Sequence, residues 1–307
     1  MSDIVTPLTP EEMSAPGQMG ASSAMDVPPS ERKLARRENW RLIRRRPSFI
    51  IGSLIVLIWV VCAVMGERIT PHSPFDFRTK VHLHPSWKFP MGTDRSGRDV
   101  LSRVMMGSRD ILKVAPLAAV LSVIAGVIIG MIMGYFRGWF DIVLGRIIEA
   151  FLALPVILLA FVAVATLGHD AWVVIFVVAA LFTPIVARTV RSAVLSERDL
   201  DYVTSAKLRG EGSIFIMFRE ILPNVMAPII VELTIRIGYA VFAVATLTFI
   251  GAGPRPPSPD WGAQVSENYT LVKSHVWWST LFPALAIASL VIAINLIADA
   301  VQSVLDA

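Results

Sequence analysis

Long apolar runs dominate the pattern of polar and hydrophobic positions along this chain. The first run, 48–66, reads SFIIGSLIVLIWVVCAVMG and carries no charge. Its length is close to the roughly 20 residues that a helix needs to cross a bilayer. Further apolar runs cover about 112–134, 142–167, 171–187, 225–250 and 280–302. The pattern predicts an all-α polytopic membrane protein with six transmembrane helices.

Charge at the ends of the first run predicts the orientation. Arg68 is the only cation close to its carboxyl end, whereas a basic cluster precedes its amino end. That cluster includes Arg41, Arg44, Arg45 and Arg46. Because cytoplasmic flanks carry the excess of Lys and Arg, we expect the amino terminus in the cytoplasm, and six helices return the carboxyl terminus there. The 67–110 loop also contains basic residues, but interleaved aspartates dilute them.

Composition along the chain predicts four parts. Residues 1–46 are expected to form a disordered, basic cytoplasmic tail, because the early part is rich in Pro, Ser, Met and Glu without apolar periodicity. Residues 47–66 form the first transmembrane helix, 67–110 an extracytoplasmic loop, and 111–303 a core of five helices. A short interfacial helix at the end of the loop is predicted from one apolar face. That face consists of Leu101, Val104, Met105 and Ser108.

The overall composition supports a membrane protein and excludes other classes. Hydrophobic residues make up 54% of the chain, and the mean hydropathy is +0.62. The net charge of +4 could indicate nucleic-acid binding. However, the basic residues flank apolar runs, so membrane topology explains them and no nucleic-acid partner is expected. The single cysteine, Cys62, excludes a disulfide framework within the chain.

A loop predicted to lie in the cytoplasm, 199–223, has an unexpected apolar character. Residues up to Leu208 read as one short helix, which the Gly210-Glu-Gly sequence ends. A second short helix can begin with Ser213 as N-cap and end at Pro223. Its apolar face is predicted to comprise Ile214, Phe218, Ile221 and Leu222. Such a face suits either the lipid interface or a groove on a soluble partner, and the pattern leaves both open.

The spacing in this loop resembles the EAA loop of binding-protein-dependent ABC importer permeases. The positions Ser205-Ala206, Gly210 and Leu222-Pro223 have the spacing of that pattern. The residue types depart from it at Thr204, Ser205 and Glu220. Other segments resemble C-type permeases of dipeptide and oligopeptide importers. They are FPMGTDRSGRDVLSRVMMGSR, DIVLGRIIEAFLALPVILLA, LTFIGAGPRPPSPDWGAQV and NLIADAVQSVLDA. The resemblance covers roughly residues 40–307.

The resemblance implies a type I ABC importer permease fold and a role as the transmembrane permease subunit of an ATP-driven peptide importer. The loop would then be a coupling element for a separate ATPase. The residues that the resemblance assigns to it are Tyr202, Ser205, Ala206, Gly210, Ser213, Phe215, Leu222 and Pro223. Implied partners are a homologous B-type permease, two ATPase subunits or one fused subunit, an extracytoplasmic peptide-binding protein and membrane lipid. The implied location is the bacterial inner membrane, with both termini cytoplasmic.

The resemblance leaves the cargo open, because similar permeases handle dipeptides, oligopeptides, glutathione, nickel complexes and haem. The chain contains no phosphate-binding loop and no nucleophile-base motif, so we expect no catalysis, no metal and no cofactor here, with ATP and Mg on the partners. His72, His82 and His84 could bind a metal, but a solvated loop is the favoured interpretation. A self-sufficient secondary transporter remains an alternative, although no convincing inverted repeat is visible.

Charged residues within apolar runs call for an explanation, because inserting each one into the membrane costs roughly 2.5–3.5 kcal/mol of free energy. Arg146 and Glu149 lie three residues apart, and Glu232 and Arg236 lie four apart, so each pair can meet on one helix face. They could be structural ion pairs or could line a path for a zwitterionic peptide. Pro155 and Pro184 are predicted to kink the third and fourth helices.

Overall fold

The computed structural model describes residues 42–77, 80–254 and 257–305. Most of the predicted disordered tail therefore lies outside the described residues. The chain divides into two units, Met1–Leu42 and Ile43–Ala307, and the membrane-length helices found among the described residues belong to the second.

The described residues form helices and loops, without a strand. The helices are α2 (Pro47–Ile69), α3 (Val100–Phe136), α4 (Gly138–Leu152), α5 (Val156–Leu167), α6 (Ala171–Glu197), α7 (Asp201–Leu208), α8 (Ser213–Phe215), α9 (Leu222–Asn224), α10 (Met226–Phe249), α11 (Trp261–Asn268) and α12 (Trp278–Leu305). A π-helix (Ile216–Ile221) joins α8 to α9, and a 3-10 helix (Tyr269–Ser274) follows α11. The all-α prediction is confirmed.

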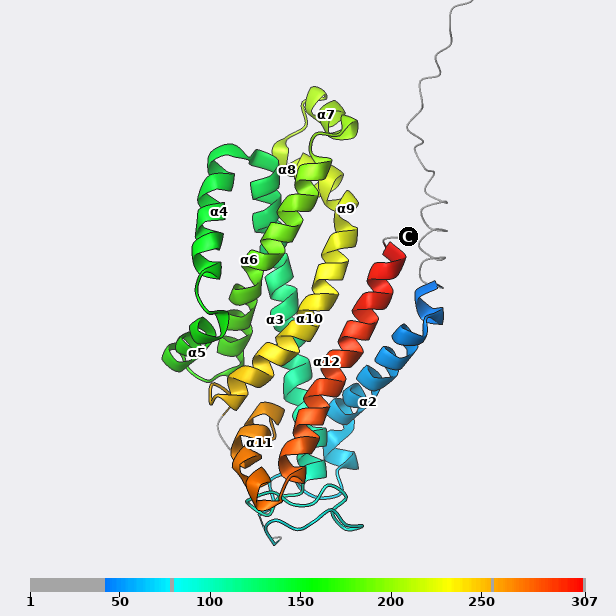
Figure 1. Ribbon diagram of the computed structural model, residues 1–307. Coiled ribbons are helices and arrows are strands. Elements are labelled where there is room, and N and C mark those ends of the chain that lie inside the picture. Colours follow the sequence, from blue (N-terminus) through cyan, green and yellow to red (C-terminus); the bar gives the residue numbers. More distant parts are fainter. Residues whose placement is uncertain (1–41, 78–79, 255–256, 306–307) are drawn as a thin grey trace, which may run out of the picture. The chain divides into compact units, whose positions relative to one another are not determined.

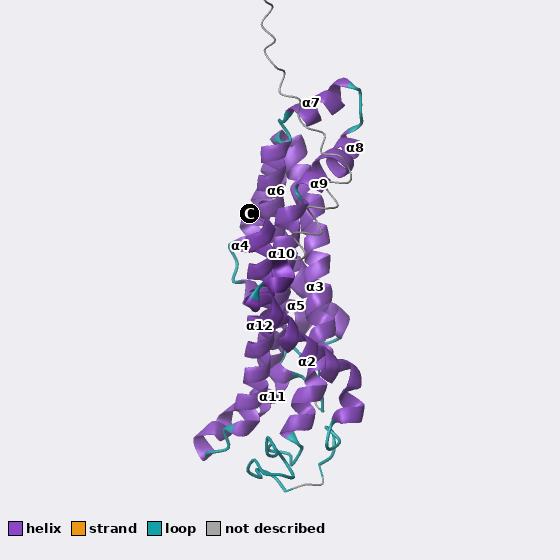
Figure 2. Ribbon diagram, turned by 90° about the vertical axis from the view of Figure 1, so that its right-hand side faces the viewer, coloured by secondary structure: helices purple, strands orange, loops and turns teal. Residues whose placement is uncertain are grey.

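Five of these helices, α2, α3, α6, α10 and α12, are long and apolar enough to cross a membrane. The α4–α5 pair makes a sixth span if its two bent halves are counted as one. The long helices run lengthwise, with α7 at one end of the bundle and α11 at the other (Figures 1 and 2). We refer to these as the α7 end and the α11 end.

The third apolar region is not the single kinked helix that the sequence predicted. It forms α4 and α5, which meet at an angle of 86°. Pro155 precedes α5 in an extended conformation, with φ −60° and ψ 110°. Its ring removes a backbone donor and disfavours helix at the preceding residue, so the chain turns instead of bending slightly. By contrast, α6 continues through Pro184 without a break.

The predicted interfacial helix before the second span is also not a separate element. Residues from Val100 onward belong to α3, a continuous helix of 37 residues. Asp99 begins it, because its carboxylate accepts a hydrogen bond from the Ser102 backbone N–H at 3.1 Å. Val104 and Ser108 are buried inside the protein. The prediction failed because Arg98, Asp99 and Arg103 at the start of this segment are buried and have partners within the fold, so this part of the helix does not face water.

Glycines allow α3 to pack closely on α6, its most extensive partner. Gly126, Gly130 and Gly134 follow one another at intervals of four residues and face Val186, Val190 and Val194. A Cβ added at Gly130 would lie 2.6 Å from the Ala187 carbonyl oxygen. Small residues at this spacing let two membrane helices approach at the backbone, where packing rather than hydrophobicity holds them together. The α3–α6 pair is therefore a stiff unit.

The remaining long helices complete the bundle around this pair. α10 packs against α3, α6 and α12, and α2 packs against α3 and α12. A Cβ at Gly52 would lie 2.5 Å from the Ala293 carbonyl oxygen, so α2 and α12 also touch at the backbone. The Trp59 indole donates a hydrogen bond to the Ser289 hydroxyl at 3.0 Å.

Candidate functional site

The loop between α6 and α10 begins with the short helix α7, which Gly210 ends. The Gly210 N–H donates to the Lys207 carbonyl at 3.0 Å, and the Glu211 N–H donates to the Ala206 carbonyl at 3.2 Å. This pair of bonds is a Schellman motif, which requires a left-handed residue after the helix. Gly210 supplies it with φ +79°. The predicted glycine turn is present, and its geometry explains why a glycine stands there.

The second half of the loop differs from the predicted regular helix. Gly212, not Ser213, is the N-cap of α8, and Ser213 is its first residue. The helix then widens into a π-helix over Ile216–Ile221, where the Leu222 N–H donates to the Met217 carbonyl. Pro223 does not end the helix but lies inside α9. A proline ring clashes with the carbonyl four residues earlier, and the wider π-turn before Pro223 relieves that clash.

One group of apolar side chains in the loop is buried in the bundle itself. Val203 and Ala206 of α7 join Ile216, Met217 and Ile221 in one cluster. The helices α3 and α6 contribute Met131, Val186, Val190 and Val194 to it. The loop is therefore seated on the α3–α6 pair, an outcome that neither sequence interpretation included.

A second group of apolar side chains in the loop is exposed. Leu208 is 84% exposed and Ile214 71%, and Phe215 and Phe218 are also exposed. We call these four residues the exposed set. The predicted common face is wrong, because Ile214 and Phe218 point outward while Ile221 is buried and Leu222 half-buried. Among the residues assigned to coupling, Ser205 and Phe215 are exposed, whereas Ala206 is buried.

Polar contacts fix the loop to the helices on either side. The Tyr202 hydroxyl donates to the Glu197 carboxylate at 2.8 Å. Burial, together with this bond, raises the pKa of Tyr202 to about 12. Across the Gly210 turn, Arg209 pairs with Glu211 at 2.7 Å and with Glu220 at 3.6 Å. Glu220, a departure from the family pattern, thus ties the two halves of the loop together.

Further contacts bind α6 to its neighbours just before the loop. The Arg198 guanidinium donates to the Tyr135 carbonyl at the end of α3 at 2.6 Å. A cation is favoured there because unpaired carbonyls give a helix carboxyl end negative charge. Arg191 forms a bidentate ion pair with Asp141 of α4, with N–O distances of 2.5 and 2.7 Å. A movement of the loop would therefore be transmitted to α3, α4 and α6 together.

The two charged pairs predicted within apolar segments lie in different surroundings. Arg236 donates to Glu232 at 2.8 Å, and both side chains are largely buried. The Arg236 guanidinium also lies over the rings of Phe182 and Tyr239. Arg146 and Glu149 pair at 3.4 Å but are exposed. Because Glu232 and Arg236 saturate each other, neither presents a free charge to a passing ligand.

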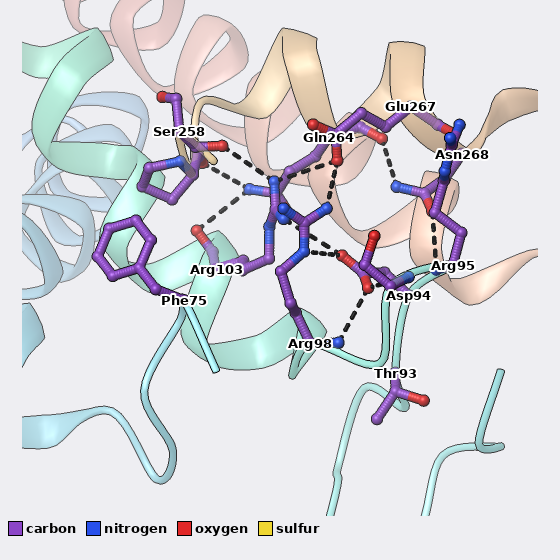
Figure 3. Close-up of polar contacts among 12 residues, drawn as sticks. Phe75, Thr93, Asp94, Arg95, Arg98, Arg103, Ser258, Gln264, Glu267 and Asn268 are labelled. Atoms are coloured by element: carbon purple, nitrogen blue, oxygen red, sulfur yellow. Dashed lines mark hydrogen bonds and ion pairs between the residues drawn. The ribbon is translucent and has the colours of Figure 1, made fainter. Parts of the chain in front are cut away.

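A buried ionic cluster at the α11 end was not predicted as a unit. Asp94 accepts hydrogen bonds from Arg98 at 2.8 Å and Arg103 at 3.2 Å, and Glu267 of α11 contacts both arginines (Figure 3). Arg103 is 0% exposed and also donates to the Ser258 carbonyl at 2.9 Å. The cluster joins the start of α3 to α11. The motif GTDRSGRD, noted only as a family resemblance, provided the sequence signal for it.

The three loop histidines do not come together. His72 stacks on Phe89 and lies 3.5 Å from Asp99, whereas His84 packs on Trp278. Throughout the part of the chain that the structure describes, no three His, Cys, Asp or Glu side chains gather as metal ligands.

A cavity of about 800 Å³ lies among α3, α6, α10 and the start of α11. Its wall is mainly apolar, with Leu117, Trp172, Ile175 and Val244 among the lining residues. A few polar side chains interrupt it, namely Asp110, Lys113, His169, Thr248 and Asp260. Its volume and mixed lining are typical of sites for small molecules.

Comparison with known families decides the identity of the chain. Residues 126–307 match the family described as "Binding-protein-dependent transport system inner membrane component". The chain belongs to this family. It is a non-catalytic, multi-pass membrane component of the ABC permease type, and membership implies an ATPase and a substrate-binding protein as partners.

Relatives of the permease cover nearly its whole length. The dipeptide transport system permease protein DppC of Escherichia coli is 39% identical over 88% of this chain and 92% of its own. DppC of Haemophilus influenzae, with the same name, is 35% identical over 89% and 95%. The di/tripeptide transport system permease protein DppC of Pseudomonas aeruginosa is 34% identical over 88% and 91%.

Proposed function

We propose that the permease is the C-type transmembrane subunit of an ATP-driven importer of peptides. The names of its relatives, which refer to dipeptides and di/tripeptides, support the cargo class. One structural observation carries the coupling role. The 201–223 loop buries one group of apolar side chains in its own bundle and leaves the exposed set facing away from it. An apolar surface held so firmly suits a groove on a soluble ATPase.

We further propose that the α7 end lies in the cytoplasm, together with both termini, in the bacterial inner membrane. Arg44, Arg45 and Arg46 precede α2, and the 201–223 loop, which includes α7, adds Lys207, Arg209 and Arg219. This excess fits the positive-inside rule. The α11 end would then receive cargo from the binding protein, and a homologous B-type permease would complete the path. ATP and Mg would bind to two ATPase subunits or one fused subunit.

Coupling follows from the continuity of two helices. α6 runs from Ala171 beside the cavity to Glu197 beside the loop, and α10 runs from Met226 beside the loop to Phe249 near the cavity. At about 1.5 Å per residue, α6 spans roughly 40 Å, or the thickness of a bilayer with its headgroups. A shift of the loop driven by the ATPase would thus move both walls of the cavity.

Reconstitution of the complete transporter tests this function. Proteoliposomes containing this chain, its partner permease and the ATPases should import a labelled dipeptide only when both ATP and the binding protein are supplied. Liposomes with this chain alone should import none. Uptake by the chain alone, driven by an ion gradient, would favour a secondary transporter and overturn the proposal.

A further inference from the structure

The cavity at the α11 end carries charges that the fold does not use. Among the described residues, Asp110 makes no hydrogen bond and no ion pair, although it lies near Lys113 and Arg109. Arg109 is engaged elsewhere, since it pairs with Glu67 at 3.0 Å. An ionisable group near the membrane that has no structural partner is a candidate for function.

Lys113 stands one helical turn after Asp110 and lines the same cavity. Residues three apart on a helix have Cβ atoms about 5–6 Å apart. Even so, these two opposite charges form no ion pair with each other in the structure. The cavity therefore holds a carboxylate and an ammonium group side by side, each free to bind a ligand.

Other groups around the cavity add to this charge pattern. The Asp260 carboxylate lines the cavity close enough to Asp110 for the two charges to interact. It is 3% exposed and accepts a hydrogen bond from the Ala263 N–H at 3.0 Å. His169 also faces the cavity, and its buried Nδ1 has no hydrogen-bond partner. The Asp110 side of the cavity thus favours a cation that also brings hydrogen-bonding groups.

We propose that this cavity is a binding site for short zwitterionic peptides, with Asp110 holding the free α-ammonium group and Lys113 the carboxylate. Two extended residues span at most about 7 Å, which suits two charges one helical turn apart. The apolar wall around Leu117 and Trp172 takes the side chains. The proposal rests on the peptide-import function and adds to it a preference for dipeptides.

The Glu232–Arg236 pair, which the sequence offered for the same task, is unsuited to it. These two side chains are bonded to each other at 2.8 Å and do not line the cavity. A ligand would have to break an existing pair in order to bind there, whereas Asp110 and Lys113 require no such exchange.

The test uses the complete transporter with its binding protein in proteoliposomes. Asp110→Asn and Lys113→Gln should each lower kcat/KM for dipeptide uptake by about tenfold, as expected for loss of one charge-assisted hydrogen bond. The amount of each variant that is inserted and assembled with the ATPases should equal that of the wild type. The matched control is Asp170→Asn, because Asp170 is an exposed carboxylate beside the cavity that does not line it.

A photoreactive dipeptide with free termini provides a direct measurement. It should label residues 110–120 or 169–175 of the wild-type chain, and Asp110→Asn should reduce that labelling about tenfold while Asp170→Asn should not. Labelling of the partner permease alone, or equal uptake by all three variants and the wild type, would overturn the site while leaving peptide import intact. Absence of dipeptide uptake by the wild type would instead refute the proposed function.

Discussion

Gly210 adopts a backbone conformation that is unfavourable for residues with a side chain. Its φ is +79°, while open space surrounds the position of an added Cβ. Left-handed backbone costs an ordinary L-residue about 1–2 kcal/mol. Gly210→Ala should therefore loosen the turn between the two halves of the loop and reduce uptake, with normal membrane insertion. Dipeptide uptake and the amount of inserted protein measure the two effects.

Gly212 supplies the matched control for this prediction. Its Cβ position is equally open, but its φ is −70°. Gly212→Ala should leave uptake near the wild-type level, and Gly210→Asn should retain more activity than Gly210→Ala because Asn tolerates left-handed backbone. Equal loss in both alanine variants would show that the conformation of Gly210 is not what matters.

The Glu232–Arg236 pair is predicted to be structural. Glu232→Leu leaves a largely buried guanidinium without its carboxylate, and breaking such a pair costs roughly 3–5 kcal/mol. The variant should melt at a lower temperature in detergent. The double variant Glu232→Leu/Arg236→Leu should recover most of that loss. A single variant with normal stability but no uptake would indicate a role in the path instead.

Asp260 gives a prediction for pH. Burial, reinforced by the nearby charge of Asp110, raises the pKa of the Asp260 carboxyl in the folded protein. Its stabilising contribution is therefore complete below the unfolded value of about 3.9 and is lost as pH rises through the folded value. Asp260→Asn keeps the helix cap without the charge, so its gain in melting temperature should grow from pH 5 to pH 8. A gain that is largest at pH 5 would contradict this sign.

At the scale of elements, the glycine contacts between α3 and α6 should control the stiffness of the bundle. Gly130→Ala places a Cβ 2.6 Å from the Ala187 carbonyl oxygen and 2.8 Å from the Val190 Cβ. Overpacking of this kind costs about 1–3 kcal/mol, so the melting temperature should fall. Gly145→Ala in α4 is the control, since its Cβ would lie 3.8 Å from the nearest atom. A stable Gly130→Ala variant would contradict the proposed close packing.

The sequence predicted elements well where one signal acted alone. Apolar length located α2, α6, α10 and α12, and Gly210 marked the end of α7. It failed where tertiary contacts competed with local pattern. The start of α3, which follows Arg98 and contains Arg103, was predicted to be an interfacial helix separate from the second span, yet Asp94 and Glu267 neutralise both arginines inside the fold.

The candidate sites follow the same rule. Spacing predicted the Glu232–Arg236 and Arg146–Glu149 pairs, because both partners lie on one helix. The cavity around Asp110 joins three long helices and a loop that are distant in sequence, so no local pattern could indicate it. The π-helix before Pro223 likewise redistributed the loop's apolar side chains in a way that a regular helical period does not describe.

At the scale of the whole molecule, the two ends depend on the same two helices. α6 and α10 flank the loop at the α7 end and line the cavity at the α11 end. The ionic cluster of Asp94, Arg98, Arg103 and Glu267 holds α11 against the start of α3. A force on the loop would therefore change the cavity between elements that are otherwise firmly fixed.

Photocrosslinking from the exposed set tests the coupling role most directly. A photoreactive residue at Ile214 in the complete transporter should give a covalent product with the ATPase, and the yield should change when ATP is added. The same residue at Leu54, an exposed position on α2, should give no such product. Products with phospholipid alone at Ile214, and none with the ATPase, would contradict the proposed coupling.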